Sequence, residues 1–231
     1  MKKNLLIACS IIVSLCSINI EAQPLNNDTD IDQYISKRNV DVYLEANFTG
    51  TPYQNKAFQN GAILKNDLVI AQNIGLRYNA AKDLFEVKKT AVLKDDQAKV
   101  LIGSKGISIN LENEKYVFLT PNENNTAQGY FVDLYSGEKA ALYKKIKKVY
   151  IPEQKAYTSY SNNVAATYKE KIILYFYQED GVLVEIPNSK KSKIKIFGDQ
   201  SKEVKLFIKE NNVNINKEAG LIEVISYYNT L

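Results

Sequence analysis

Two residue types on which much enzyme chemistry depends are missing from most of this chain. It has no histidine, and its only two cysteines, Cys9 and Cys16, lie within the first 22 residues. Residues 23–231 therefore lack the parts for Ser-His-Asp triads, Cys-His dyads, zinc fingers and histidine-ligated haem or iron. The sequence predicts a protein that is not an enzyme, that holds no metal or cofactor, and that forms no disulfide after residue 22.

The first 22 residues have the pattern of a secretory signal peptide. Lys2 and Lys3 precede an apolar run over residues 5–20, and Ala22 supplies a small residue behind it. Such signals have a basic start, a short apolar core and a small residue at the cleavage point. We expect cleavage after Ala22, a secreted or periplasmic location with association to the outer membrane left open, and no later helix that spans a membrane.

Arginine is scarce, and the net charge is small. Without residues 1–22, the 30 basic and 26 acidic residues become 28 and 25, which leaves a net charge of +3. Arg38 and Arg77 are the only arginines, and lysine is a poor substitute for arginine in bidentate phosphate recognition. The sequence argues against a nucleic-acid partner and leaves an envelope protein, a lipid or an anionic polysaccharide as candidates.

Tryptophan is absent, but 16 tyrosines are present, many of them in short apolar runs between turn residues. Such runs are typical of half-buried strands. Asp180-Gly181 separates residues 172–177 from 182–186, which is a strong hairpin signal, and residues 75–78 and 84–87 flank a second turn. The density of turns predicts an antiparallel β-sheet, as a meander or a half-open barrel.

The periodicity changes after Pro187. Val204, Phe207 and Ile208 share one side of a predicted helix, for which Asp199 or Ser201 is the expected N-cap.

A second apolar stripe has the i, i+3, i+4, i+7 spacing of a helix. It consists of Leu221, Val224, Ile225 and Tyr228. Residues 189–197 fit both a strand and a helix. We therefore expect an α+β protein, and its predicted parts are a signal peptide (1–22), a flexible acidic leader (23–39), an antiparallel β domain (40–187) and a helical appendage packed on it (188–231).

Two sets of segments carry a resemblance to a known family. One set is residues 75–80 with 83–87, and the other is residues 207–209 with 211–213, 221–222 and 227–229. Together they resemble a family of uncharacterised secreted or periplasmic proteins of Gram-negative bacteria with a β-rich body and a lysine-rich helical C-terminal tail. The resemblance implies export and a β-then-α layout, and it supplies no catalytic residue.

Few candidate site residues remain once histidine and cysteine are excluded. Ser136 and Ser192 each begin an S-x-x-K match, but the companion motifs of serine-lysine enzymes are missing. Arg77 is notable because it lies between apolar neighbours in a predicted strand, where it could pair with Glu86 or bind an anionic head. The candidate ligand or partner contacts are Arg77, Tyr78, Lys144, Lys145, Lys147 and Lys148.

The sequence predicts an exported, non-enzymatic envelope protein that acts as a binding or interaction module. One alternative is a periplasmic carrier that encloses an apolar or lipid-like ligand in a curved sheet, with Arg77 at the mouth of the cavity. A second alternative is a hydrolase that uses carboxylates or lysine, and no pair of carboxylates in the sequence favours it.

Overall fold

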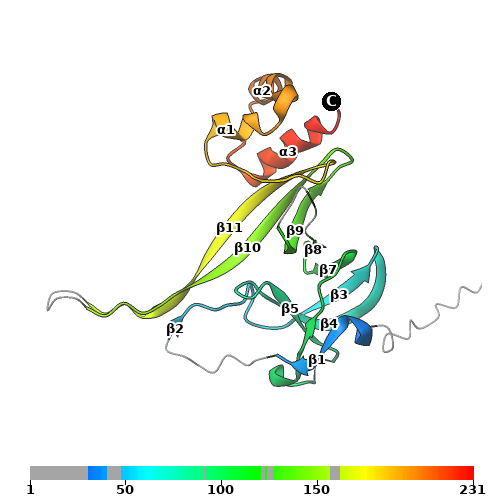
Figure 1. Ribbon diagram of the computed structural model, residues 1–231, viewed down its shortest axis with the longest axis vertical. Coiled ribbons are helices and arrows are strands. Elements are labelled where there is room, and N and C mark those ends of the chain that lie inside the picture. The colour runs from blue at the N-terminus through cyan, green and yellow to red at the C-terminus, as the bar shows by residue number, and fades with distance from the viewer. Residues whose placement is uncertain (1–30, 41–47, 91, 121–122, 124–126, 157–161) are drawn as a thin grey trace, which may run out of the picture.

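The computed structural model describes residues 31–40, 48–90, 92–120, 123, 127–156 and 162–231 (Figure 1). Its strands form one 12-stranded sheet. They are β1 (Ile35–Asn39), β2 (Phe48–Thr49), β3 (Gln59–Lys65), β4 (Leu68–Asn79), β5 (Leu84–Lys88), β6 (Lys99–Leu101), β7 (Ile107–Leu111), β8 (Glu114–Leu119), β9 (Gly129–Ser136), β10 (Ala140–Ile151), β11 (Ala166–Gln178) and β12 (Leu183–Glu185).

The sheet is open and largely a meander. Its strand order is β1-β6-β5-β4-β3-β7-β8-β9-β10-β11-β12, and neighbouring strands along this path are antiparallel. The meander form of the prediction is therefore confirmed, and the half-open barrel is not what the structure shows. Both predicted hairpins are present, as β4–β5 and β11–β12.

One pair of strands corrects the wholly antiparallel prediction. β2 lies off the main path and pairs with β11 in parallel, with Phe48 opposite Ala166 and Thr49 opposite Thr167. The ring of Phe48 also packs edge-on against Tyr168 at 5.2 Å between centroids. This contact joins residues more than a hundred positions apart, and a short-range hairpin signal cannot reveal it.

The sheet begins earlier than the sequence indicated. Residues 31–39 were assigned to the acidic leader, and they form a 3₁₀ turn, η1 (Ile31–Tyr34), followed directly by β1. Ile31 and Ile35 are buried in the core, which explains why this end of the segment is ordered onto the sheet. The rest of the predicted leader, residues 23–30, lies outside the described residues.

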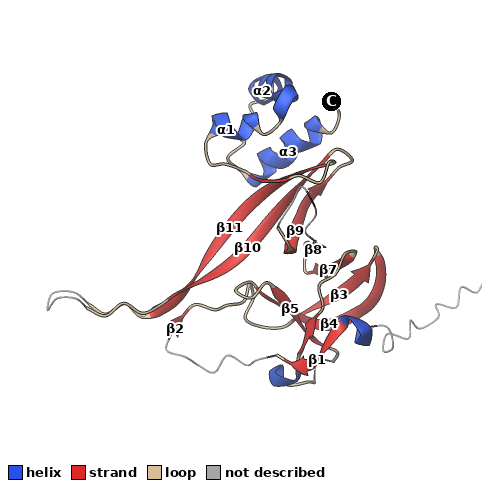
Figure 2. Ribbon diagram, in the orientation of Figure 1, coloured by secondary structure: helices blue, strands red, loops and turns tan. Residues whose placement is uncertain are grey.

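Helices follow the sheet, as predicted, and the described residues contain three of them: α1 (Lys190–Lys195), α2 (Ser201–Glu210) and α3 (Glu218–Tyr228) (Figure 2). The second and third are the two helices that the sequence predicted. α1 resolves the ambiguity of residues 189–197, and its N-cap is Ser189, which accepts a hydrogen bond from the Ser192 N–H at 3.1 Å. The N-cap of α2 is Gln200, because the 3₁₀ turn η3 (Gly198–Gln200) precedes the helix. The predicted caps Asp199 and Ser201 are therefore wrong.

The apolar stripe of α3 packs on β9 and β10, which confirms the prediction for this helix. Leu221, Val224 and Ile225 are at most 2% exposed, and Tyr228 is partly buried beside them. This helical cluster contacts Leu142 of β10 and other buried side chains of the sheet. A second cluster fills the space among β1 and β3–β9 and includes Ile146 of β10.

Two strands extend beyond their neighbours and form a two-stranded ribbon. β9 pairs with β10 only over residues 141–144, and β12 pairs with β11 only over residues 175–177. We define the ribbon as residues 145–151 of β10 with residues 167–173 of β11. In Figure 1 the ribbon runs away from the three helices toward the lower left, and β2 lies near its far end.

The ribbon has two distinct faces. β10 and β11 pair without a register break from Ala140↔Gln178 to Ile151↔Thr167. Successive side chains of a strand point to opposite faces, so the odd-numbered residues of both strands share one face. The even-numbered face carries Leu142 and Phe176, on which the helices pack. The helices therefore leave the odd-numbered face uncovered.

Candidate functional site

Arg77 forms a buried ion pair with Glu86, which Lys88 and the exposed Asp95 extend. It lies opposite Glu86 across the β4–β5 hairpin, and its Nη2 donates to Glu86 Oε2 at 2.7 Å. Its Nη1 donates to Asp95 Oδ2 at 3.1 Å, and the second carboxylate oxygen of Asp95 accepts from Lys88 Nζ at 3.1 Å. The side chains of Arg77 and Glu86 are 8% and 2% exposed. The predicted pair with Glu86 is therefore present, in the interior of the protein.

Aromatic rings and a carbonyl complete the surroundings of Arg77. Its guanidinium lies 4.0 Å from the ring centroid of Tyr53 and 4.1 Å from that of Phe58. Nη1 also donates to the backbone carbonyl of Lys56 at 3.0 Å. All three guanidinium nitrogens thus donate within the protein, because Nε binds Glu86 as well. This arrangement gives Arg77 a structural role.

A second buried network joins Tyr78 and Lys145 through one carboxylate. Lys145 Nζ donates to Asp83 Oδ2 at 2.6 Å and to the carbonyl of Tyr130 at 2.8 Å, and it lies 4.4 Å from the ring centroid of Phe131. Tyr78 donates to Asp83 Oδ1 at 2.7 Å. Burial lowers the pKa of Lys145, and the charge of Asp83 opposes that shift. Burial raises the pKa of Tyr78, with the Asp83 charge as the second cause.

Gly129 is required where this network meets β9. Its φ is +106°, which residues with a Cβ rarely adopt. A Cβ at this position would overlap the Asp83 carboxylate and lie 2.8 Å from Lys145 Nζ. The absence of a side chain at Gly129 thus lets the backbone approach the ion pair. The network connects the start of β5 with β9 and β10.

Two further predicted contacts are also in ion pairs. Lys144 Nζ lies 2.7 Å from Glu114 Oε1, and Lys148 Nζ lies 2.8 Å from Glu170 Oε2. These pairs are more exposed than the two networks above, and such pairs contribute little to stability. Five of the six residues predicted as ligand or partner contacts are therefore engaged within the protein, and Lys147 is the exception.

Lys147 lies in a group of lysines that have no acidic partner among the residues the structure describes. It is directly opposite Lys171 on the ribbon, and the next pair on the same face is Val149 with Lys169. All three lysines are exposed, and the ion pairs of the described residues include none of them. We call the face formed by Lys147, Lys169 and Lys171 the lysine face. It is the exposed part of the odd-numbered face, which the helices leave uncovered, while Lys145 on the same face is buried and paired with Asp83.

Two of the three lysines of this face are not predicted from the sequence. Lys169 and Lys171 were not among the predicted contacts, because the strand was expected to begin at residue 172, whereas β11 begins at Ala166. A usable signal was present in the sequence. Tyr168-Lys169-Glu170-Lys171 alternates lysine with other residues, and a period of two brings both lysines to one face of a strand.

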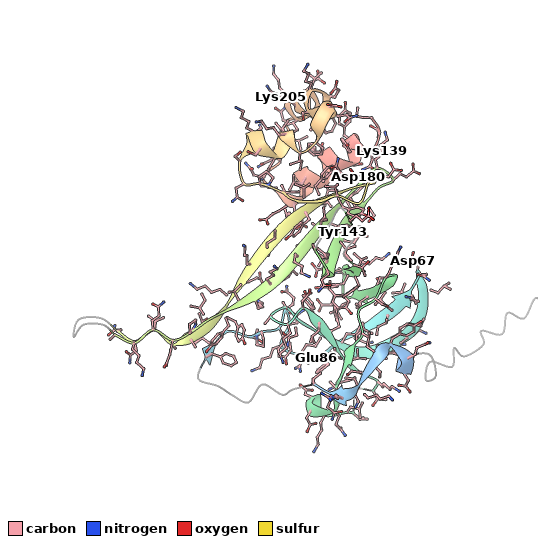
Figure 3. The ribbon with its side chains drawn as sticks, viewed as in Figure 1. Asp67, Glu86, Lys139, Tyr143, Asp180 and Lys205 are labelled. Carbon is pink, nitrogen blue, oxygen red and sulfur yellow. The ribbon has the colours of Figure 1, made fainter. Side chains whose placement is uncertain are left out.

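Toward the helices, the odd-numbered face becomes aromatic. The ring of Tyr143 lies 5.9 Å from Tyr177, and the ring of Phe131 lies 5.5 Å from Tyr175. Tyr143 is 9% exposed, and Figure 3 places it on β10 between the helical end and the rest of the sheet. Burial and, second, the charge of Asp133 raise the pKa of Tyr143 to about 12.

The raised pKa of Tyr143 predicts a loss of stability at alkaline pH. An unfolded tyrosine ionises near pH 10. Between about pH 10 and about pH 12 the unfolded state has lost a proton that the folded state keeps, so rising pH favours unfolding. Tyr143 should lower the free energy of unfolding by about 1.4 kcal/mol per pH unit across this window and contribute no such change at lower pH.

The variant Tyr143→Phe isolates this contribution. Urea denaturation of both proteins across the alkaline range should give a shallower decline for the variant between about pH 10 and pH 12. Tyr78, Tyr116 and Tyr130 also have raised pKa values, so both proteins lose stability there and only the difference between them is informative. If the free energies of unfolding of the two proteins fall in parallel with pH, Tyr143 has the same pKa in the folded and unfolded states.

Open grooves are present on the sheet, away from Arg77. One, of about 580 Å³, is lined by Ile35, Val87 and Leu93 together with charged side chains that include Lys37 and Lys89. Arg77 is not part of its lining. Within the described ranges, no group of three or more acidic, histidine or cysteine side chains could hold a metal ion. The described helices include none with the length and apolar character needed to cross a membrane.

A comparison with known protein families, curated proteins and solved structures found no significant match. The family resemblance drawn from the sequence therefore stays a prediction. The residues themselves indicate a function, above all the ribbon lysines that have no carboxylate partner among the described residues.

Proposed function

We propose that this protein is an exported, non-enzymatic binding module of the cell envelope, and that its lysine face binds an anionic partner. The observation that carries the proposal is the distribution of charge on β10 and β11. Of the lysines on these strands, Lys144, Lys145 and Lys148 have carboxylate partners. The lysines without such partners among the described residues all share one face, which the helices do not cover.

The cross-strand position of these lysines adds support. Lys147 and Lys171 face each other directly in the ladder, and like charges in that position destabilise a sheet. Burial is the main cause that lowers the pKa of Lys145, Asp83 opposes it, and the charge of Lys147 is the smallest of the contributions. An anionic ligand would relieve this repulsion. A cluster of one sign of charge also attracts oppositely charged partners from a distance.

A purely protective role is the competing explanation. The outer edges of the ribbon have few strand partners, and lysines commonly protect such edges from pairing with other chains. That role requires only that the lysines repel other strands. It predicts no saturable binding of a polyanion at this face, so the two explanations differ in a measurable way.

The test is the binding of heparin, a soluble polyanion, to residues 23–231. Wild-type protein should bind it with an affinity that falls as salt increases. Replacing Lys147, Lys169 and Lys171 together by Gln should weaken binding by at least about tenfold, because three surface charges are lost.

A matched control removes the same charge from the helical end. Lys202, Lys205 and Lys209 are exposed on α2, and Figure 3 shows Lys205 at the end of the molecule remote from the ribbon. Their replacement by Gln should leave heparin binding nearly unchanged. Equal losses in both triple variants, or no binding by the wild type, would refute the proposed surface.

A further inference from the structure

We infer that the anionic partner is the headgroup layer of a lipid membrane, and that the ribbon is the element that docks on it. This inference rests on the proposed function and deepens it. Its basis is a second set of side chains, apolar and exposed, on the same hairpin as the lysine face. Electrostatic attraction to anionic lipids and shallow burial of apolar side chains are the two contributions that bind proteins to membrane surfaces.

Both faces of the ribbon carry exposed apolar side chains near the lysines. Val149, on the lysine face, is 46% exposed, while Tyr150 and Ile172, on the opposite face, are 51% and 55% exposed. Val164, just before β11, is 56% exposed. Four of the large hydrophobic side chains that are exposed in the described chain thus lie on this hairpin. A soluble polyanion needs only the lysines and leaves these apolar groups without a role.

The shape of the molecule suits this contact. The ribbon projects away from the helices in Figure 1, so it can meet a surface along its length without the helical end approaching it. The seven residues of each ribbon strand span roughly 23 Å. Interfacial elements enter the headgroup region to a depth of roughly 5–10 Å, so the ribbon is long enough to reach that depth. Tyr150 packs beside Tyr168 at 5.3 Å, and tyrosine is enriched at the level of the headgroups.

The charges disfavour a second copy of this chain as the occupant. Two ribbons meeting through their lysine faces would bring Lys147, Lys169 and Lys171 of each copy together without carboxylates to offset them. An anionic membrane offers negative charge over a wide area, and each lysine near such a surface contributes about 1 kcal/mol of attraction, equivalent to roughly a fivefold gain in affinity.

The experiment compares two kinds of vesicle with heparin. Residues 23–231 should co-sediment with vesicles of phosphatidylcholine mixed with phosphatidylglycerol, and only weakly with phosphatidylcholine alone. Replacing Lys147, Lys169 and Lys171 by Gln should reduce vesicle affinity by about 100-fold and should also weaken heparin binding.

An apolar variant separates lipid from other polyanions. Replacing Val149, Val164 and Ile172 by Thr keeps β-branched side chains on the hairpin and removes apolar surface. Vesicle affinity should fall about tenfold, while heparin binding should stay unchanged. The matched control replaces other exposed apolar residues, Leu68, Val69 and Ile102, by Thr and should change neither.

A fluorescence measurement tests the same contact without weakening it. The chain has no tryptophan, so Tyr150→Trp introduces a single reporter on the ribbon. Its emission should shift to the blue on mixed vesicles and be quenched by brominated lipids, and that of Leu68→Trp should not. Absence of a shift for Tyr150→Trp would overturn the inference.

The possible failures are distinguishable. Heparin binding without vesicle binding would overturn the membrane inference and leave the proposed function standing, with a soluble anionic polysaccharide as the favoured partner. An apolar variant that binds vesicles as well as the wild type does would also overturn the inference. Binding to neither heparin nor vesicles would refute both proposals.

Discussion

Replacement of Arg77 by Ala is expected to lower the free energy of unfolding by about 3–5 kcal/mol, the usual effect of removing one partner of a buried ion pair. The reason is that the variant leaves the carboxylate of Glu86 buried without its cationic partner. Its side chain is 2% exposed, and Arg77 supplies two hydrogen bonds to its Oε2. The variant also loses the packing of the guanidinium between Tyr53 and Phe58. Urea denaturation at neutral pH measures the loss.

The other arginine of the chain provides a matched control. Arg38 lies on β1 and is exposed, so Arg38→Ala should change the free energy of unfolding by no more than about 0.5 kcal/mol. The double variant Arg77→Met with Glu86→Leu removes both charges, and it should recover much of the stability that Arg77→Ala loses. An Arg77→Ala protein as stable as the wild type would show that Glu86 is not held in a dry interior.

Replacement of Ile225 by Ala is expected to cost about 2–5 kcal/mol, because the side chain is fully buried between α3 and the sheet. The loss combines the transfer of apolar groups to water with the cavity that remains. Leu206→Ala on α2 is the control, since Leu206 is 55% exposed and its truncation should have little effect. Equal stability of Ile225→Ala and the wild type would mean that the helices are not held on the sheet by this stripe.

Local signals in the sequence predict the turns and helices well but not the distant pairings. Asp180-Gly181 and the stripe that begins at Leu221 depend on neighbouring residues alone, and both predictions are confirmed. The parallel pair between β2 and β11, and the burial of Ile31 and Ile35, depend on strands far away in the chain. The pattern of residues 31–49 does not predict which strand these residues pair with or pack against.

The same limit decides how much of the site could be predicted. Lys144, Lys145, Lys147 and Lys148 are predicted contacts because they are basic, but which of them are available depends on carboxylates elsewhere in the chain. Asp83 is 62 positions from Lys145, and Glu114 is 30 positions from Lys144. The register of β10 against β11 then brings Lys169 and Lys171 beside Lys147. A list of basic residues therefore could not separate the structural lysines from the exposed ones.

β10 contributes side chains to both large apolar clusters, with Leu142 in the helical cluster and Ile146 in the cluster of the N-terminal strands. On β9, Leu134 packs against both clusters. Because β9 and β10 contribute to both clusters, unfolding of one cluster would also disrupt strands on which the other is packed. The two halves should therefore lose their structure in one cooperative transition, in which calorimetric and van't Hoff enthalpies agree. Shared strands thus make the helices and the sheet a single thermodynamic unit.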